Sequence, residues 1–172
     1  TTALPPLERR DESALIATGI PALDTSLRGG LPRGQLSEIV GAPSSGRTTL
    51  LLQTIAASTR RGEIAAFVDT FDRLDVASAA NSAVDLDRLL WIRGTTAPPV
   101  DAVINRALKA LNLILQGGGF GCVVLDLSDA PAIALKRIPF TTWLRVQRVI
   151  EGSDTACVLV VPQPVARSAG GL

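Results

Sequence analysis

Eight consecutive residues, from Gly41 to Thr48, have the types and the spacing of a loop that binds phosphate. They read Gly-Ala-Pro-Ser-Ser-Gly-Arg-Thr, which matches the pattern G-x-x-x-x-G-K-[S/T] at all but one position. Glycine lets the backbone wrap closely around an anion so that successive N–H groups point at its oxygens, and the start of a following helix adds positive potential. The last hydroxyl of the loop is suited to binding Mg²⁺. The residues expected to contact a nucleotide are Gly41, Ser44, Ser45, Gly46, Arg47, Thr48 and Thr49.

The departure from the pattern is Arg47, which stands where lysine is expected. Lysine places a compact ammonium against the terminal phosphates, whereas arginine is a larger planar group that favours edge-on, bidentate contacts. Three outcomes are therefore open. Arg47 can still attract phosphate, it can turn outward to an ion pair or a nucleic acid, or the loop can persist as a structural turn without nucleotide.

A second candidate for the same chemistry is Asp126, which lies at the end of the apolar run 122–127. A carboxylate at the end of such a strand orients Mg²⁺ and its water in nucleotide hydrolases that carry this loop. An aspartate after an apolar run is common by chance, and the signal gains specificity from its pairing with the loop 41–48. The sequence therefore predicts Thr48 and Asp126 as Mg²⁺ ligands if a nucleotide binds.

Short apolar runs alternate with helical patterns along the chain, and these elements must position the loop and the carboxylate. Glycine and proline punctuate residues 19–34, and the loop then follows a strand and precedes a helix, which is the order that the phosphate motif requires. The pattern indicates an α/β fold with a mostly parallel central sheet, flanked by helices in three layers. The expected strands are 35–40, 63–69, 89–92, 122–127 and 156–161, and the expected helices are 47–60, 74–83, 98–117 and 142–150.

Composition excludes several classes of protein. Of the 172 residues, 47% are hydrophobic and 19% are charged, and the net charge is +1, so neither disorder nor a global affinity for polyanions is indicated. The absence of histidine excludes Ser-His-Asp and Cys-His chemistry. Cys122 and Cys157 lie in apolar runs and are expected to be buried, reduced thiols. No segment has the pattern of a leader or of a membrane helix, so we expect a cytoplasmic protein.

The order of these motifs resembles the RecA family of recombinases, from about Ala17 to Gln163. The resemblance implies a RecA-like core domain over 18–163, preceded by an N-terminal segment, 1–17, and followed by a flexible tail, 164–172. It rests on stretches that match in register, namely 18–24, 29–34, 38–41, 44–50, 66–69 and 74–75.

The resemblance also shows where this chain departs from the family. In recombinases the second core strand ends with a glutamate that positions the attacking water, and here that position is Phe71. The neighbouring Asp72 is the candidate that could take over this role. Asp75 matches a residue that contacts adenine, whereas the aromatic residue that stacks on the base is replaced by Ser78. The resemblance therefore implies ATP and Mg²⁺ as cofactors, with weakened binding and with weak or absent ATPase activity.

Two further family features concern DNA. Gln163 matches the glutamine that senses the γ-phosphate, and the two mobile loops through which the family binds single-stranded DNA fall near 128–140 and after Gln163. The basic residues of these segments, which are the DNA-binding candidates, are Lys136, Arg137 and Arg167. So few cations predict weak, salt-sensitive binding, and a solvated charged edge is the alternative. Self-association is compatible with the resemblance, but the N-terminal region looks too short for full filament formation.

Three functions remain open at this point. The first is a RecA-like accessory protein in DNA repair, recombination or damage-induced (SOS) mutagenesis, similar to the ImuA-like and SulA-like proteins that accompany translesion polymerases. The second is an active DNA-dependent ATPase, or recombinase core, in which Arg47 holds phosphate and Asp72 orients the water. The third is a protein-interaction module that recruits a polymerase or a recombinase.

Overall fold

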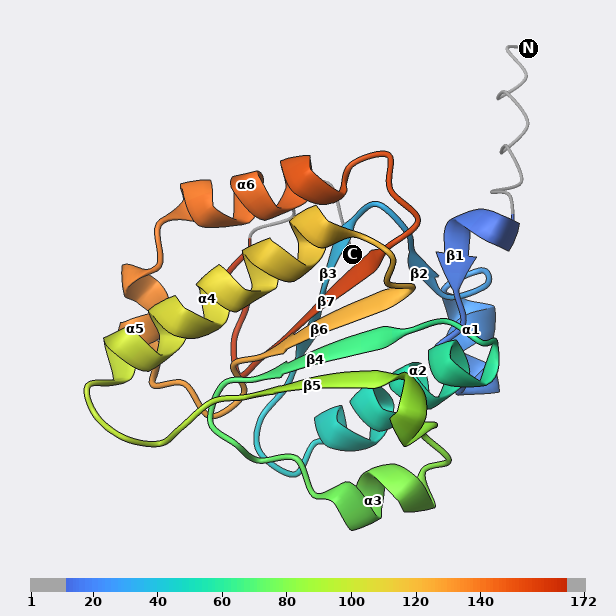
Figure 1. Cartoon of the computed structure of the whole chain (residues 1–172), viewed down its shortest axis with the longest axis horizontal. Helices are drawn as coiled ribbons and strands as arrows, with labels where there is room; N and C mark the ends of the chain where they lie inside the picture. The colour runs from blue at the N-terminus through green and yellow to red at the C-terminus, as the bar shows by residue number, and fades with distance from the viewer. Residues whose placement is uncertain (1–11, 167–172) are drawn as a thin grey trace, which may run out of the picture.

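The computed structural model describes residues 12–166 and contains a five-stranded sheet with helices on both faces (Figure 1). The strand order is β3-β7-β6-β4-β5, and all four neighbouring pairs are parallel. This architecture confirms the predicted three-layer α/β fold. The strands are β3 (Leu36–Val40), β4 (Ala65–Asp69), β5 (Leu89–Arg93), β6 (Cys122–Asp126) and β7 (Ala156–Val161).

Side chains alternate between the two faces of the sheet along each strand. Both faces are apolar, and a layer of helices covers each of them. On one face, Phe67 and Val124 join a core with α2 (Arg47–Arg60) and α3 (Val76–Asn81). On the other face, Val68 and Leu125 pack with α4 (Val100–Gly117), α5 (Ala132–Arg137) and α6 (Phe140–Ile150). Every central strand is therefore buried on both sides, which accounts for the uninterrupted apolar runs in the sequence.

Short elements precede the sheet. They are the 3₁₀ turn η1 (Glu12–Ala14), the strands β1 (Leu15–Ile16) and β2 (Leu31–Pro32), and α1 (Pro21–Ser26), while η2 (Leu86–Arg88) leads into β5. β1 and β2 pair antiparallel, with Ile16 opposite Leu31. Gly30 has a φ of +132°, and a Cβ there would overlap the carbonyl oxygen of Ile16. Only glycine allows the two short strands to approach this closely.

The helix α5 was not predicted, because residues 128–140 were assigned to a mobile loop. Its six residues bury Ala134 and Leu135 against the core and place Lys136 and Arg137 in the last turn. A helix of this length gives too few repeats for a clear helical period. The short helix α1 was overlooked because the glycines and prolines around it indicated turns.

The two cysteines are free and buried, as predicted. Cys157 lies opposite Val123 in the pairing of β7 with β6, so its side chain is on the other face of the sheet from that of Cys122. Burial raises the pKa of the Cys122 thiol to about 12 and also raises the pKa of Cys157. Both thiols are therefore unreactive at neutral pH. Across the described part of the chain, no helix has both the length and the apolar character to span a membrane.

Candidate functional site

The carboxyl ends of the five parallel strands meet at one edge of the sheet (Figure 1). The loop 41–46 follows β3, while Asp69, Arg93 and Asp126 are the last residues of β4, β5 and β6. Gln163 follows β7 by two residues. Residues that are far apart in the sequence are thus collected at the edge where open α/β sheets place their ligand sites.

The loop between β3 and α2 is a tight turn with two residues in the left-handed region. Ser44 and Gly46 both have positive φ angles, +61° and +90°, and Gly46 directly precedes the first residue of α2. Gly41 N–H donates to Val161 O at 3.3 Å, which fixes the start of the loop to β7. A Cβ at Gly41 would overlap the hydroxyl of Ser45, whereas one at Gly46 would meet nothing within 4 Å. The loop is therefore tightly packed at Gly41, whereas the space beside Gly46 is open.

Arg47 is half-buried at the start of α2, and Thr48 and Thr49 are exposed in the same turn. The Nη1 atom of Arg47 is buried, and within residues 12–166 it has no hydrogen-bond partner. A buried guanidinium nitrogen without an acceptor is costly. Its position at the N-terminus of a helix is where an anionic group would supply that acceptor.

Asp69 and Asp126 lie side by side, because they are register partners in the pairing of β4 with β6. Their side chains are on the sheet face that α2 covers, since they continue the alternation set by Phe67 and Val124. Asp69 is fully buried, and its carboxylate accepts hydrogen bonds from the backbone N–H groups of Arg73 and Leu74. It also accepts from the indole N–H of Trp91 at 3.1 Å. Asp69 therefore shapes the turn after β4.

Asp126 is the less engaged carboxylate of this pair. It accepts a hydrogen bond from Ser128 N–H at 2.8 Å. Burial raises the pKa of Asp126, and the nearby charges of Asp69 and Asp129 raise it further, while the hydrogen bond from Ser128 opposes this shift. A bound cation would relieve this repulsion.

The donor set fits Mg²⁺ but not a metal held by protein alone. Within the described residues, no three acidic, cysteine or histidine side chains gather closely enough to hold a metal ion. Mg²⁺ in nucleotide sites is bound by one or two protein oxygens together with phosphates and water. Thr48 and Asp126 can supply two such oxygens from α2 and β6.

The segment after β4 carries the departures from the recombinase pattern. Phe71 is only 8% exposed and belongs to the core beneath α4. Asp72 has a φ of +57°, and its two carboxylate oxygens accept from Nε and Nη2 of Arg93, each at 2.8 Å. This ion pair lowers the pKa of Asp72. The guanidinium of Arg93 also lies over the ring of Trp91, 4.5 Å from its centroid.

Asp75 is the N-cap of α3. Its carboxylate accepts from the backbone N–H of Ser78 at 2.9 Å and from the Ser78 hydroxyl at 2.5 Å. The bonds from Ser78 lower the pKa of Asp75. In this arrangement the two positions associated with adenine in the family are bonded to each other.

Gln163, Lys136 and Arg137 line a common hollow of about 590 Å³ between α5, the start of α6 and the segment after β7. Arg137 also forms an exposed ion pair with Asp101 of α4, at 2.8 Å. The structure thus brings together the two segments predicted to bind DNA. The third DNA-binding candidate, Arg167, and tail residues 167–172 lie outside the described residues.

Three residues that participate in this edge were not predicted from the sequence. Glu38 of β3 accepts from the backbone N–H groups of Val165 and Ala166, both at 2.9 Å, and so fastens the segment after Gln163. A charged residue inside an apolar strand indicates a specific polar contact, and Glu38 in β3 is such a residue. Arg93 and Trp91 gave no such signal, because their roles depend on β5 lying beside β4.

The chain has a parallel sheet with helices on both faces, and a glycine-containing loop joins β3 to α2. It is therefore a three-layer α/β protein, a class in which ligands generally bind at the carboxyl ends of the strands. The family model described as the RecA N-terminal domain matches residues 6–135. The chain therefore belongs to the RecA family.

Individual relatives agree with this assignment. The sequence is 41% identical to Protein RecA of Clavibacter michiganensis subsp. michiganensis over 120 residues, which is 69% of this chain and 31% of that protein. It is 42% identical to Protein RecA of Methylococcus capsulatus over 113 residues, with 65% and 30% of the two chains covered. With Protein RecA of Desulforapulum autotrophicum the identity is 39% over 113 residues. The matched region spans about a third of the length of these curated relatives.

Proposed function

We propose that this chain is a RecA-type accessory protein of DNA repair, recombination or damage-induced mutagenesis, which keeps a nucleotide cradle but hydrolyses ATP weakly or not at all. The observation that carries the proposal is the burial of Phe71 at the position where recombinases place their water-orienting glutamate. A phenyl ring neither accepts a proton nor orients water. Loss of a general base costs roughly 10²- to 10⁴-fold in rate.

The replacement candidate, Asp72, is poorly placed to restore that activity. Both of its carboxylate oxygens are bonded to Arg93, and its pKa is lowered by that pair. A base in such a pair is weakly basic and is not free to bind water. This supports the accessory function over the alternative of an active DNA-dependent ATPase.

The cradle itself supports retained, weakened binding of ATP with Mg²⁺. The unpartnered Nη1 of Arg47 and the two left-handed residues of the loop suit a phosphate, and Thr48 and Asp126 would hold the metal. Mg²⁺, when bound, would neutralise charge on the phosphates. The base would be held less firmly, since Asp75 is bonded to Ser78 and a serine side chain offers no ring for stacking.

Single-stranded DNA is the partner that the hollow beside Gln163 suits. Lys136 is exposed at its rim without an ion pair among the described residues, while the neighbouring Arg137 is bonded to Asp101. With two cations at this site, binding would be weak, and its salt slope would be only about 1.4, or about 0.7 for each phosphate that is neutralised.

Calorimetric titration of ATP with Mg²⁺, together with a phosphate-release assay with and without single-stranded DNA, tests the proposal. We expect measurable nucleotide binding and phosphate release at or near background. Turnover at rates ordinary for recombinases would refute the accessory function and favour the active ATPase.

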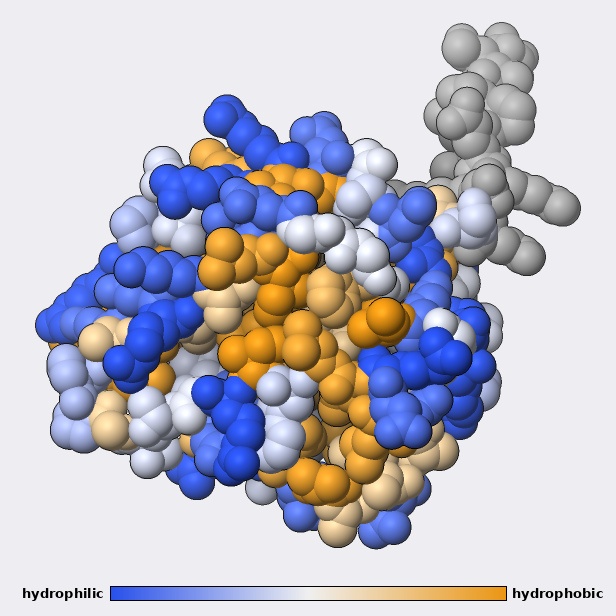
Figure 2. All heavy atoms as spheres, viewed as in Figure 1, coloured by the Kyte–Doolittle hydropathy of each residue, from blue (hydrophilic) through white to orange (hydrophobic). Residues whose placement is uncertain are grey.

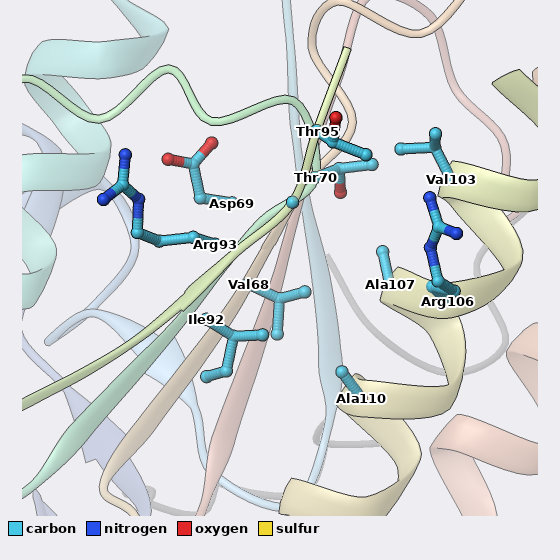
Figure 3. A pocket seen from close by; sticks show the side chains of 11 residues that line it. Val68, Asp69, Thr70, Ile92, Arg93, Thr95, Val103, Arg106, Ala107 and Ala110 are labelled. Carbon is cyan, nitrogen blue, oxygen red and sulfur yellow. The ribbon is translucent and has the colours of Figure 1, made fainter. Parts of the chain in front are cut away.

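A second candidate function, protein docking, is favoured by the outer edge of β5. Leu90 is 44% exposed there, and Figure 2 shows apolar side chains gathered over β5 and α4. Beside it lies a hollow of about 170 Å³ in which Val68 and Ile92 face Ala107 and Ala110 of α4 (Figure 3). An open strand edge next to an apolar hollow suits an extended segment of a partner such as a recombinase or a translesion polymerase.

Pull-down of such a partner with and without nuclease separates this function from association through DNA. Leu90→Glu should abolish nuclease-resistant capture while leaving the nucleotide site intact. Capture that nuclease removes would exclude direct docking.

A further inference from the structure

The hollow beside Gln163 continues into a furrow along the helical layer. It shares Arg137, Ile138 and Pro139 with a second hollow of about 210 Å³ between α4 and α5. That one in turn shares Asn105, Leu108 and Thr142 with a third, of about 300 Å³, between α4 and α6. The three hollows therefore form one continuous path from the end of β7 to the groove between α4 and α6. We call this path the α4–α6 furrow.

Positive charge is concentrated along this layer although the whole chain is nearly neutral. Helices α4, α5 and α6 contain six lysine and arginine residues and a single acidic residue, Asp101. Lys109 and Arg145 line the third hollow from opposite helices. Neither forms an ion pair within the described residues, so both charges are uncompensated. Segregated cations of this kind attract a polyanion.

The lining between the cations suits a nucleic acid strand. Asn105, Asn112 and Thr142 offer amide and hydroxyl groups at the rim, and Leu108 and Val146 form an apolar floor. Side chains of these types contact phosphates, sugars and bases in protein–nucleic acid interfaces. An acidic peptide would bind better in a groove with distinct apolar pockets for its anchors, whereas this furrow is a shallow series of hollows.

We propose that a single strand of nucleic acid bound beside Gln163 continues along the α4–α6 furrow, with Lys109 and Arg145 contacting its phosphates. This inference rests on the proposed function, since it extends the DNA surface described there. Asp101 lines the second hollow and is paired with Arg137, which lines both the first and the second. A phosphate entering the furrow competes with that exposed carboxylate for Arg137, so Asp101 weakens binding at this point.

Fluorescence anisotropy with labelled single strands of two lengths, roughly 5 and roughly 20 nucleotides, tests the proposal. The double variant Lys109→Gln, Arg145→Gln should bind the long strand roughly tenfold more weakly at physiological salt, with a salt slope smaller by about 0.7 for each phosphate that it no longer neutralises. Its affinity for the short strand should be unchanged. Asp101→Asn should bind the long strand more tightly.

A matched control removes two exposed arginines elsewhere, Arg28→Gln and Arg60→Gln, which changes the net charge equally. If this control weakens the long strand as much as the furrow variant does, the furrow is not a binding path. That result would leave the proposed DNA function standing, provided that the short strand still binds. Absence of binding to either strand would overturn both proposals. Displacement of the long strand by polyglutamate at equal charge would assign the furrow to acidic polypeptides instead.

Discussion

Arg93 holds Asp72 through two parallel hydrogen bonds of 2.8 Å, from the end of β5 to the turn after β4. This ion pair engages both carboxylate oxygens of Asp72, the residue next to the position where recombinases carry their glutamate. The guanidinium of Arg93 also lies over the ring of Trp91, so both Asp72 and Trp91 fix its position. This relationship makes Asp72 part of the local structure of the turn.

Replacement of Asp72 by asparagine should therefore leave nucleotide turnover unchanged and lower stability slightly. The folded pKa of Asp72 is depressed, so its contribution is present above the ordinary aspartate pKa and is lost as pH falls through the lower folded value. Urea denaturation of the variant at neutral and acidic pH, with phosphate release measured in parallel, checks this. Arg93→Gln is the matched control. Loss of turnover specific to Asp72→Asn would assign a catalytic role to this carboxylate.

Phe71 should behave as a core residue. Phe71→Ala is expected to destabilise the fold by about 3 kcal/mol because it leaves a cavity, whereas Phe71→Leu should cost less than about 1.5 kcal/mol. Phe71→Glu restores the family's residue type but places a charge in the core, so it should be less stable than the alanine variant and should not gain turnover. Denaturant midpoints and phosphate release measure these effects. A stable, active Phe71→Glu variant would contradict the assignment.

Asp126→Asn should raise stability at neutral pH. An acid whose pKa is raised on folding prefers to be protonated in the folded state, so its ionisation opposes folding, and this penalty disappears as the pH falls through the raised pKa. The gain should thus vanish in acid. Nucleotide binding should also depend less on Mg²⁺ in the same variant, since one of the two expected protein ligands is lost. Asp87→Asn, at an exposed residue of η2, serves as the comparison.

Arg47→Lys should tighten ATP binding by about tenfold, because the compact ammonium of lysine fits against the terminal phosphates better than the larger planar guanidinium does. Turnover should stay at background, since Phe71 is unchanged. Calorimetry on this variant and on Arg47→Ala, which should bind more weakly than the unmodified chain, makes the comparison. Equal affinity of all three proteins would show that residue 47 does not contact the nucleotide.

Glu38→Gln should loosen the segment after Gln163. An amide oxygen accepts more weakly than a carboxylate from the N–H groups of Val165 and Ala166, so a loss of about 1 kcal/mol is expected. Hydrogen exchange at residues 163–166 should accelerate, while exchange in β4 and β6 should not change. Uniform acceleration throughout the sheet would instead indicate global destabilisation.

Most of the sheet could be predicted because burial on two faces leaves a clear mark in the sequence. The run 156–161 and the helix 47–60 coincide with β7 and α2 at both ends. The failures, α1 and α5, are six-residue helices: α1 buries no residue and α5 buries only Ala134 and Leu135, so neither shows a helical period in the sequence. The assignment of 128–140 to a mobile loop was wrong for this reason.

The sequence predicted the positions of site residues only where a local pattern indicates them. The position of the loop between β3 and α2, and that of Asp126 at the end of β6, follow from spacing and from the strand pattern. No local pattern in the sequence reveals the partners of Asp72 and Asp75. The ion pair with Arg93 joins residues on different strands, and the cap with Ser78 competes with the family's use of that position.

The placement of the two thiols on opposite sides of the sheet has a practical benefit. Neither Cys122 nor Cys157 will react with maleimides at neutral pH, and the intervening sheet keeps them from cross-linking to each other. A single cysteine introduced on the surface, for example at Leu113, which is 68% exposed, would therefore carry a spectroscopic label without removal of the native pair. Distances to a labelled oligonucleotide then become measurable on an otherwise unaltered protein.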